Sequence, residues 1–284
     1  MPGELFAIVS AFFLASSGIV ARIALSKKGS PFTAFLTFAS GTLVVWLLVL
    51  ISDYELPNKT GALFFISRGI LDPGIAPFLI YVAFRKIGVI FTVPIIATYP
   101  LVSTTLSVIF LKETLTLFIA LGTLFIILGV MLLNYKHTRN IAHLKSILLV
   151  VAGTILIGVS TVITKFALND SDLPISGLAY SFTSGILIQI LIITILRKWK
   201  ELRMDWKISR LFFLTGIFVS IGFMFGFIAF SQGDVVIIGP LASTLPLFSL
   251  MLSKIILKKY ETITKNAIIG TVFIVFGASI LALV

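Results

Sequence analysis

Two residues of opposite charge lie inside one of the apolar stretches of this chain. Arg68 and Asp72 fall within the apolar run 61–84, and Asp72 is at its middle. Four residues of α-helix rise about 6 Å and return to the same face, so the two side chains can pair. A charge at the centre of a bilayer costs about 2.5 to 3.5 kcal/mol on insertion scales, so both are expected to face a cavity and not lipid. We interpret the pair either as a substrate or proton-coupling site or as an ion pair that locks the helix to a neighbour.

Prolines follow this pair directly and recur in two later apolar runs. Pro73 and Pro77 each remove an intrahelical hydrogen bond, which leaves backbone carbonyls beside Asp72 in need of another partner. Four further helix breaks are expected in the runs 87–111 and 235–253, at Pro94, Pro100, Pro240 and Pro246. Polar side chains lie beside these breaks near the midplane: Tyr99, Ser103, Ser243 and Thr244. Broken helices line binding sites in inverted-repeat transporters, although serine and threonine also commonly bond to their own backbone.

Other side chains are candidates for the walls of a cavity or for helix ends. The expected wall residues are Tyr81, Phe223, Met224 and Phe227, although with 26 phenylalanines in the chain such side chains also pack in cores or face lipid. Arg22 and Lys165 are expected to extend toward lipid headgroups from helix ends. Glu113 and Glu261 are expected to cap the runs that follow them, where a carboxylate suits the helix dipole.

Catalytic and metal chemistry is not indicated by the residues present. The two histidines, His137 and His143, lie in a polar segment, and the chain has no cysteine, HExxH motif or pair of intramembrane aspartates. The chain also lacks a glycine-rich phosphate loop, so ATP would have to be used by a separate subunit, of which nothing is evident. We therefore expect no enzyme activity, no cofactor and no metal, and we expect transport energy to come from a gradient.

The elements that hold these residues are predicted to be apolar helices. The chain has 284 residues, of which 58% are hydrophobic and 12% charged, with a mean hydropathy of +1.16. A membrane-spanning helix takes about 20 apolar residues, and lipid leaves no water to satisfy an open backbone. Ten runs are long enough to span: 5–21, 32–51, 61–84, 87–111, 114–135, 146–164, 173–196, 211–232, 235–253 and 263–284. This composition excludes a soluble enzyme and predicts an all-α integral membrane protein.

The second half of the chain repeats the first. Three segments recur at nearly constant spacing: 113–129 matches 261–277 at a shift of 148, 98–103 matches 244–249 at 146, and 22–25 matches 165–168 at 143. The prediction is two five-helix repeats, 1–135 and 146–284, joined by a linker at 136–145. Because each copy has an odd number of spans, the second must be inverted in the membrane relative to the first.

Loop charges agree with this inversion. Of the 21 lysines and arginines outside the run interiors, eighteen fall on one side of the predicted topology and three on the other. The positive-inside rule then places the linker in the cytoplasm and both termini outside. The net charge of +11 is accordingly read as a feature of loops that face anionic lipid, and no nucleic-acid partner is expected.

This duplicated pattern resembles the drug/metabolite transporter superfamily, specifically its EamA-type members. The matching residues are Pro100, Glu113, Gly122 and Gly129 in the first half and Pro246, Glu261, Gly270 and Gly277 in the second. The resemblance implies a secondary transporter or exporter of small metabolites such as amino acids. It also implies a central cavity lined chiefly by the third, fourth, eighth and ninth helices. Such proteins commonly place both termini in the cytosol, which departs from the orientation that the loop charges favour.

The predicted function is a gradient-driven exporter or exchanger of a small metabolite such as an amino acid. It would work by alternating access about a midplane site in a multi-pass protein of the cell membrane. The expected partners are the small-molecule substrate, membrane lipid and, if Asp72 couples transport, protons. The alternative is a passive channel or a lipid-handling membrane protein.

Overall fold

The computed structural model describes residues 2–27, 30–114, 116–134, 141–203, 205–256 and 265–281. Within these ranges every regular element is helical. The elements are α1 (Pro2–Lys27), η1 (Pro31–Thr33), α2 (Ala34–Ile51), α3 (Lys59–Gly69), η2 (Ile70–Ile75), α4 (Ala76–Lys86), α5 (Val89–Ile96), α6 (Tyr99–Phe110), α7 (Leu117–Asn134), α8 (Ile141–Asp170), α9 (Pro174–Ile195), η3 (Trp199–Leu202), α10 (Trp206–Gln232), α11 (Val235–Ala242), α12 (Leu245–Ile256) and α13 (Lys265–Leu281). The predicted all-α architecture is confirmed.

Eight helical segments of the described chain are long and apolar enough to cross a membrane. They correspond to the predicted runs other than 114–135 and 263–284, which contain α7 and α13 instead. Large apolar side chains are exposed on the outer faces, among them Leu47 (56%), Leu191 (52%) and Val272 (59%). Such faces suit hydrocarbon and not water, so the chain is a multi-pass membrane protein.

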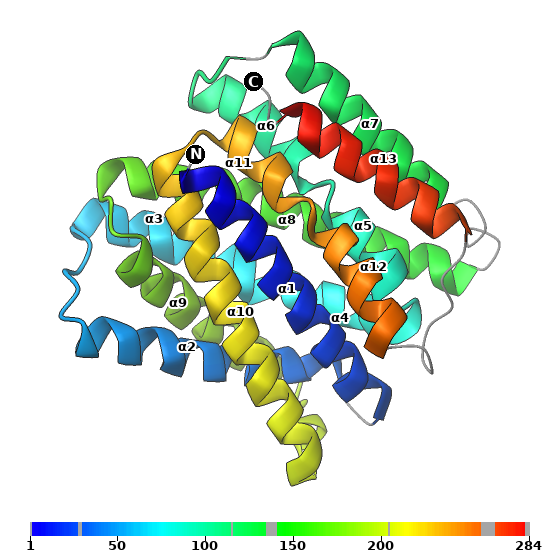
Figure 1. The fold of residues 1–284 in the computed structure, drawn as a ribbon. Helices are drawn as coiled ribbons and strands as arrows, with labels where there is room; N and C mark the ends of the chain where they lie inside the picture. Colours follow the sequence, from blue (N-terminus) through cyan, green and yellow to red (C-terminus); the bar gives the residue numbers. More distant parts are fainter. Residues whose placement is uncertain are drawn as a thin grey trace.

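The first half packs against the second along most of its length. Helix α1 runs beside α10, α2 packs on α9 and α10, and α3 and α4 pack on α8 (Figure 1). Between them lies a core of aromatic rings, in which Phe38 meets Phe182 edge to face at 5.5 Å between centroids. Trp46 on α2 donates from Nε1 to Thr183 Oγ1 on α9 at 2.8 Å. The interior of the protein is therefore the interface between the halves.

Helices α7 and α13 form a pair at the edge of this bundle, where Figure 1 draws them side by side. Their backbones touch at glycines, because a Cβ added at Gly129 would lie 2.5 Å from the carbonyl oxygen of Gly270. Small residues at helix crossings let backbones approach closely in membranes. The glycines of the repeated motif thus join α7 to α13.

Candidate substrate cavity

The third predicted span is interrupted near its centre. Between α3 and α4 the backbone forms the π-helical segment η2, in which Asp72 is extended (φ −144°, ψ 111°) and precedes Pro73 in a cis peptide bond. Pro73 lacks an N–H and its ring blocks the preceding turn, so the helix cannot continue through it. Pro77 lies in the first turn of α4, where a missing N–H has no helical partner to lose.

A neighbouring helix binds the backbone at this interruption. Gln189 on α9 donates from Nε2 to the carbonyl of Pro73 at 2.6 Å, and it is fully buried. One turn earlier, a Cβ at Gly69 would lie 2.0 Å from the carbonyl oxygen of Ser181. This close approach lets the Ser184 hydroxyl reach the Ile66 carbonyl at 3.0 Å. Helix α9 therefore fixes the position of Asp72 from outside the cavity.

Arg68 and Asp72 form a buried ion pair. The distance from Arg68 Nη2 to Asp72 Oδ2 is 2.9 Å, and the two residues are 3% and 4% exposed. The rings of Phe223 and Phe227 flank the guanidinium, whose Cζ lies 4.9 and 5.1 Å from their centroids. Arg68 Nε and Nη1 are buried without a hydrogen-bond partner among the described residues. A guanidinium with donors to spare is suited to bind a further acceptor such as a carboxylate.

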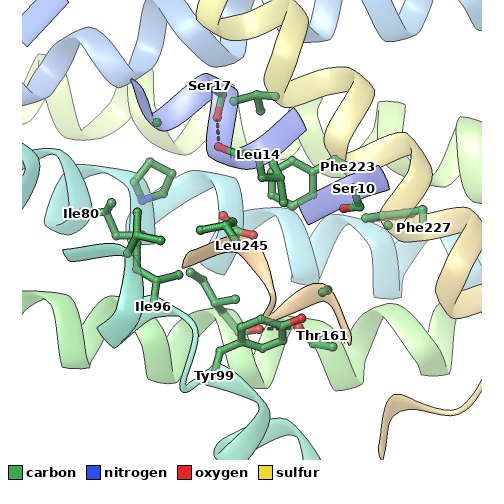
Figure 2. A pocket seen from close by; sticks show the side chains of 18 of the residues that line it. Ser10, Leu14, Ser17, Ile80, Ile96, Tyr99, Thr161, Phe223, Phe227 and Leu245 are labelled. Carbon is green, nitrogen blue, oxygen red and sulfur yellow. Dashed lines mark hydrogen bonds between the residues drawn. The ribbon is translucent and has the colours of Figure 1, made fainter. Parts of the chain in front are cut away.

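Both charged residues line a cavity of about 190 Å³ between the halves. Figure 2 shows side chains from several helices facing it, with Ser10 and Ser17 from α1, Tyr99 from α6, and Phe223 and Phe227 from α10. Most of the wall is apolar, so the Arg68–Asp72 pair supplies the charge of the cavity among the described residues.

The wall of the cavity repeats with the spacing of the sequence. Nine pairs of lining residues are separated by 143 or 146 positions: Leu14 and Ile157, Gly18 and Thr161, Ala21 and Thr164, Pro77 and Phe223, Ile80 and Gly226, Tyr81 and Phe227, Phe84 and Phe230, Ile96 and Ala242, and Tyr99 and Leu245. The ion pair has no such partner, because the positions 146 or 147 residues further along, within 214–219, carry no charge. A nearly symmetric cavity thus carries its charges on one side only.

The structure brings together some of the residues expected at this site and separates others. Arg68, Asp72 and Pro77 line the cavity together with Tyr81, Tyr99, Phe223 and Phe227. The remaining candidates lie outside its lining: Pro73, Pro94, Pro100, Ser103, Met224, Pro240, Ser243, Thr244 and Pro246.

Among the outlying residues of this set, two serines contact backbone carbonyls, whereas Thr244 Oγ1 is buried without a hydrogen-bond partner among the described residues. Ser243 Oγ donates to the Gly239 carbonyl at 3.1 Å, and Tyr99 OH reaches the same carbonyl at 3.0 Å. Ser103 is fully buried, with its hydroxyl 3.5 Å from the Pro100 carbonyl. Met224 packs against the core.

Prolines mark equivalent interruptions in both halves. Helix α5 contains Pro94 and ends before α6, which has Pro100 in its first turn. Helix α11 contains Pro240 and ends before α12, whose second residue is Pro246. The interruptions at 97–98 and 243–244 are 146 positions apart, so each half has a broken helix beside the cavity.

Sequence reasoning missed the contribution of the first and sixth spans. Ser10 and Ser17 on α1, and Thr161 and Thr164 on α8, all line the cavity. The available signal was the 143-residue repeat, since it places the matching segments of these two spans at equivalent depth.

Three expectations about helix ends were wrong. Glu113 does not cap the run that follows it but accepts from the backbone N–H groups of Val235 and Val236, 3.1 and 3.0 Å away, at the start of α11. Arg22 bonds to the carbonyls of Phe84 and Arg85 at the end of α4. Lys165 donates to the carbonyls of Phe230 and Gly233 at 3.0 and 2.9 Å, at the end of α10. All three bind the unpaired backbone groups of another helix, which are always in need of partners. Glu261 lies outside the described residues.

The comparisons with known proteins agree with this architecture. The EamA-like transporter family matches residues 1–135 and 144–283. The chain belongs to this family. A crystal structure whose title names no function is similar over 99% of this chain and 97% of that one, with 18% identity and a TM-score of 0.75. That likeness shows the fold alone. A search of the curated proteins finds no match.

Membership in the EamA-like family makes the chain a transporter of small molecules. The family consists of transporters and not of enzymes. Among the described residues no group of three or more His, Asp or Glu side chains is placed to hold a metal ion.

Proposed function

We propose that this EamA-like protein is a gradient-driven carrier that exports or exchanges a small metabolite such as an amino acid. The cavity between the halves is its binding site, and the halves rock about that site to expose it to each side of the membrane in turn. The observation that supports this most is a cavity whose wall is paired by the repeat and whose charges form one buried ion pair. We place the carrier in the cell membrane, with the repeats at 1–135 and 146–284 as its moving units.

The chemistry of the wall fits a zwitterion with an apolar side chain. Arg68 has unpaired donors for a carboxylate, and Asp72 is an acceptor for an ammonium group or a proton. The rings of Phe223 and Phe227 offer an apolar surface beside them. A bound substrate that pairs with both charges would offset the cost of keeping them in the membrane.

Substrate flux into liposomes tests the proposal. The substrate is first identified by a thermal-shift screen of the purified protein against amino acids, amines, organic acids and nucleotides, since a ligand that binds the folded state raises the unfolding midpoint. Liposomes preloaded with the hit should then accumulate labelled hit from outside, a counterflow that saturates with concentration. Flux without counterflow would indicate a channel, and lipid transfer between vesicles without solute flux would indicate a lipid-handling protein.

The orientation is tested separately. We propose that the linker is cytoplasmic and that both termini are outside, because of the distribution of loop cations. A cysteine introduced at Asn58 should react with an impermeant thiol reagent in intact cells, and one introduced at Arg139 should not. The reverse pattern would show that the opposite orientation holds.

A further inference from the structure

Two walls face each other across the cavity, and neither coincides with a sequence half. Helix α1 packs along α10, since a Cβ at Gly222 would lie 2.8 Å from the Leu14 side chain. Helix α8 packs along α4, since a Cβ at Gly153 would lie 3.4 Å from Ile80. One wall is thus α1 with α10 and the other α4 with α8 (Figure 1).

One cation crosses between these walls at each end of the cavity. Arg22 on α1 binds the last carbonyls of α4, and Lys165 on α8 binds the last carbonyls of α10. The two cations are repeat equivalents, 143 positions apart. The residues that precede them, Ala21 and Thr164, both line the cavity.

The two contacts lie at opposite faces of the membrane. The end of α10 lies beside the start of α1, because a Cβ at Gly3 would be 3.4 Å from the Ala229 carbonyl oxygen. Arg22 is nineteen residues further along α1 than Gly3, a distance of about 28 Å at 1.5 Å per residue. We call the Arg22 end the basic face, since most loop cations belong to it, and the Lys165 end the opposite face.

Each contact is suited to be broken and remade. The helix C-terminal carbonyls have no partner within their own helix, and a cation there also interacts favourably with the helix dipole. Both cations are partly exposed, so water can replace the carbonyls when the walls separate. Phe84 and Phe230, whose carbonyls are bound, are themselves equivalent wall residues, so separation at either end moves the cavity lining directly.

We infer that Arg22 and Lys165 are the two gate residues of this carrier, Arg22 closing the cavity toward the basic face and Lys165 toward the opposite face. Alternating access is then the alternate release of one contact while the other holds the walls together. This inference depends on the proposed carrier function, but its test reads accessibility and not transport.

The absence of native cysteine makes a direct test possible. Ser17→Cys places a single thiol on the cavity wall, and labelling by an impermeant methanethiosulfonate is measured in right-side-out and inverted vesicles. Arg22→Met in this background should raise the labelling rate from the basic face about fivefold, the ratio expected for losing one cation at a helix C-terminus. Lys165→Met should do so from the opposite face only. The conservative Arg22→Lys should label at close to the parent rate.

The matched controls each remove one cation, from the basic face or from the opposite face, that makes no hydrogen bond to a carbonyl of the opposite wall among the described contacts. Lys27 is exposed at the end of α1, and Lys59 is exposed at the start of α3. Lys27→Met and Lys59→Met should leave both rates unchanged. Equal increases from both faces, no increase in either gate variant, or the same increase in the controls would overturn the assignment. Each gate variant is decisive by itself, so loss of one from the membrane leaves the other as the test. Labelling of the parent from both faces is expected of a carrier that alternates between its two states, whereas solute flux without counterflow in liposomes would contradict the proposed function itself.

Discussion

Removal of the Asp72 charge alone is expected to destabilise the protein strongly. Asp72→Asn keeps the side-chain shape but leaves Arg68, which is 3% exposed, as an unpaired charge between Phe223 and Phe227. Breaking a buried ion pair from one side costs about 3 to 5 kcal/mol. Since whole proteins are stable by about 5 to 15 kcal/mol, such a loss should lower the unfolding midpoint in detergent markedly.

The double variant separates stability from transport. Arg68→Gln combined with Asp72→Asn removes both charges and should restore much of the stability, because buried pairs contribute little beyond neutral replacements. On our proposal it should still fail to concentrate substrate in the counterflow assay. A double variant that folds and transports normally across the pH range would refute the role of the pair and leave it as a packing feature.

An exposed pair provides the control for this experiment. Lys198 and Glu201 form a 2.6 Å ion pair in the loop between α9 and α10, where their side chains are 44% and 34% exposed. Exposed pairs contribute at most about 1 kcal/mol. Glu201→Gln should therefore shift the midpoint far less than Asp72→Asn, and a similar shift would show that burial is not the cause.

Three further outcomes are expected. Pro100→Ala and Pro246→Ala should insert normally yet lower transport, because each alanine restores a backbone N–H and lets the two short helices beside the cavity join into one. Counterflow at the wild-type rate in both variants would show that the interruptions matter only for packing. Glu113→Gln should lower the unfolding midpoint by weakening the cap of α11, with a cost of about 1 kcal/mol that a thermal scan against wild type would measure. The hydrogen bond from Lys198, with one from Ser30, lowers the pKa of Glu201 below its ordinary 4.5, so its contribution is present above that pH and is lost as pH falls through the lowered pKa. The midpoints of wild type and Glu201→Gln should converge on acidification, and a gap that stays constant would contradict this.

Composition and the repeat were sufficient to predict the membrane fold. Apolar runs of about 20 residues allow few alternatives in lipid, where the backbone must be satisfied internally. The runs 114–135 and 263–284 were predicted as spans, and their described helices, α7 and α13, pair at Gly129 as the repeated glycines suggest. Length and periodicity suffice here because each helix is specified by its own sequence.

Contacts between distant helices were not predictable in the same way. From the sequence, Arg22 was expected to reach lipid headgroups and Glu113 to cap the run that follows it, yet both bind the ends of other helices. Which helix end lies within reach depends on packing that no local pattern encodes. The same holds for Thr161, whose place in the cavity follows from the approach of α8 to α4 and not from its neighbours in sequence. The charged pair could be found because its partners are four residues apart in one predicted span, although Asp72 lies in η2 and not in the same α-helix as Arg68.

The one-sided placement of the ion pair affects how such a carrier behaves when no gradient is present. If the two halves were identical throughout, the states open to either face would be related by a two-fold rotation about an axis in the membrane plane and would have equal free energy. The positions 146 or 147 residues after Arg68 and Asp72 fall within 214–219, which carries no charge, so the exchange of the two halves' roles does not restore the same environment. The two states then differ in population at rest, and half-saturation by substrate differs between the two faces. Detailed balance requires the maximal transport rates in the two directions to differ by the same factor as the two half-saturation concentrations. The preferred resting state therefore sets the substrate concentration range to which each face responds, but it does not set the direction of net flow.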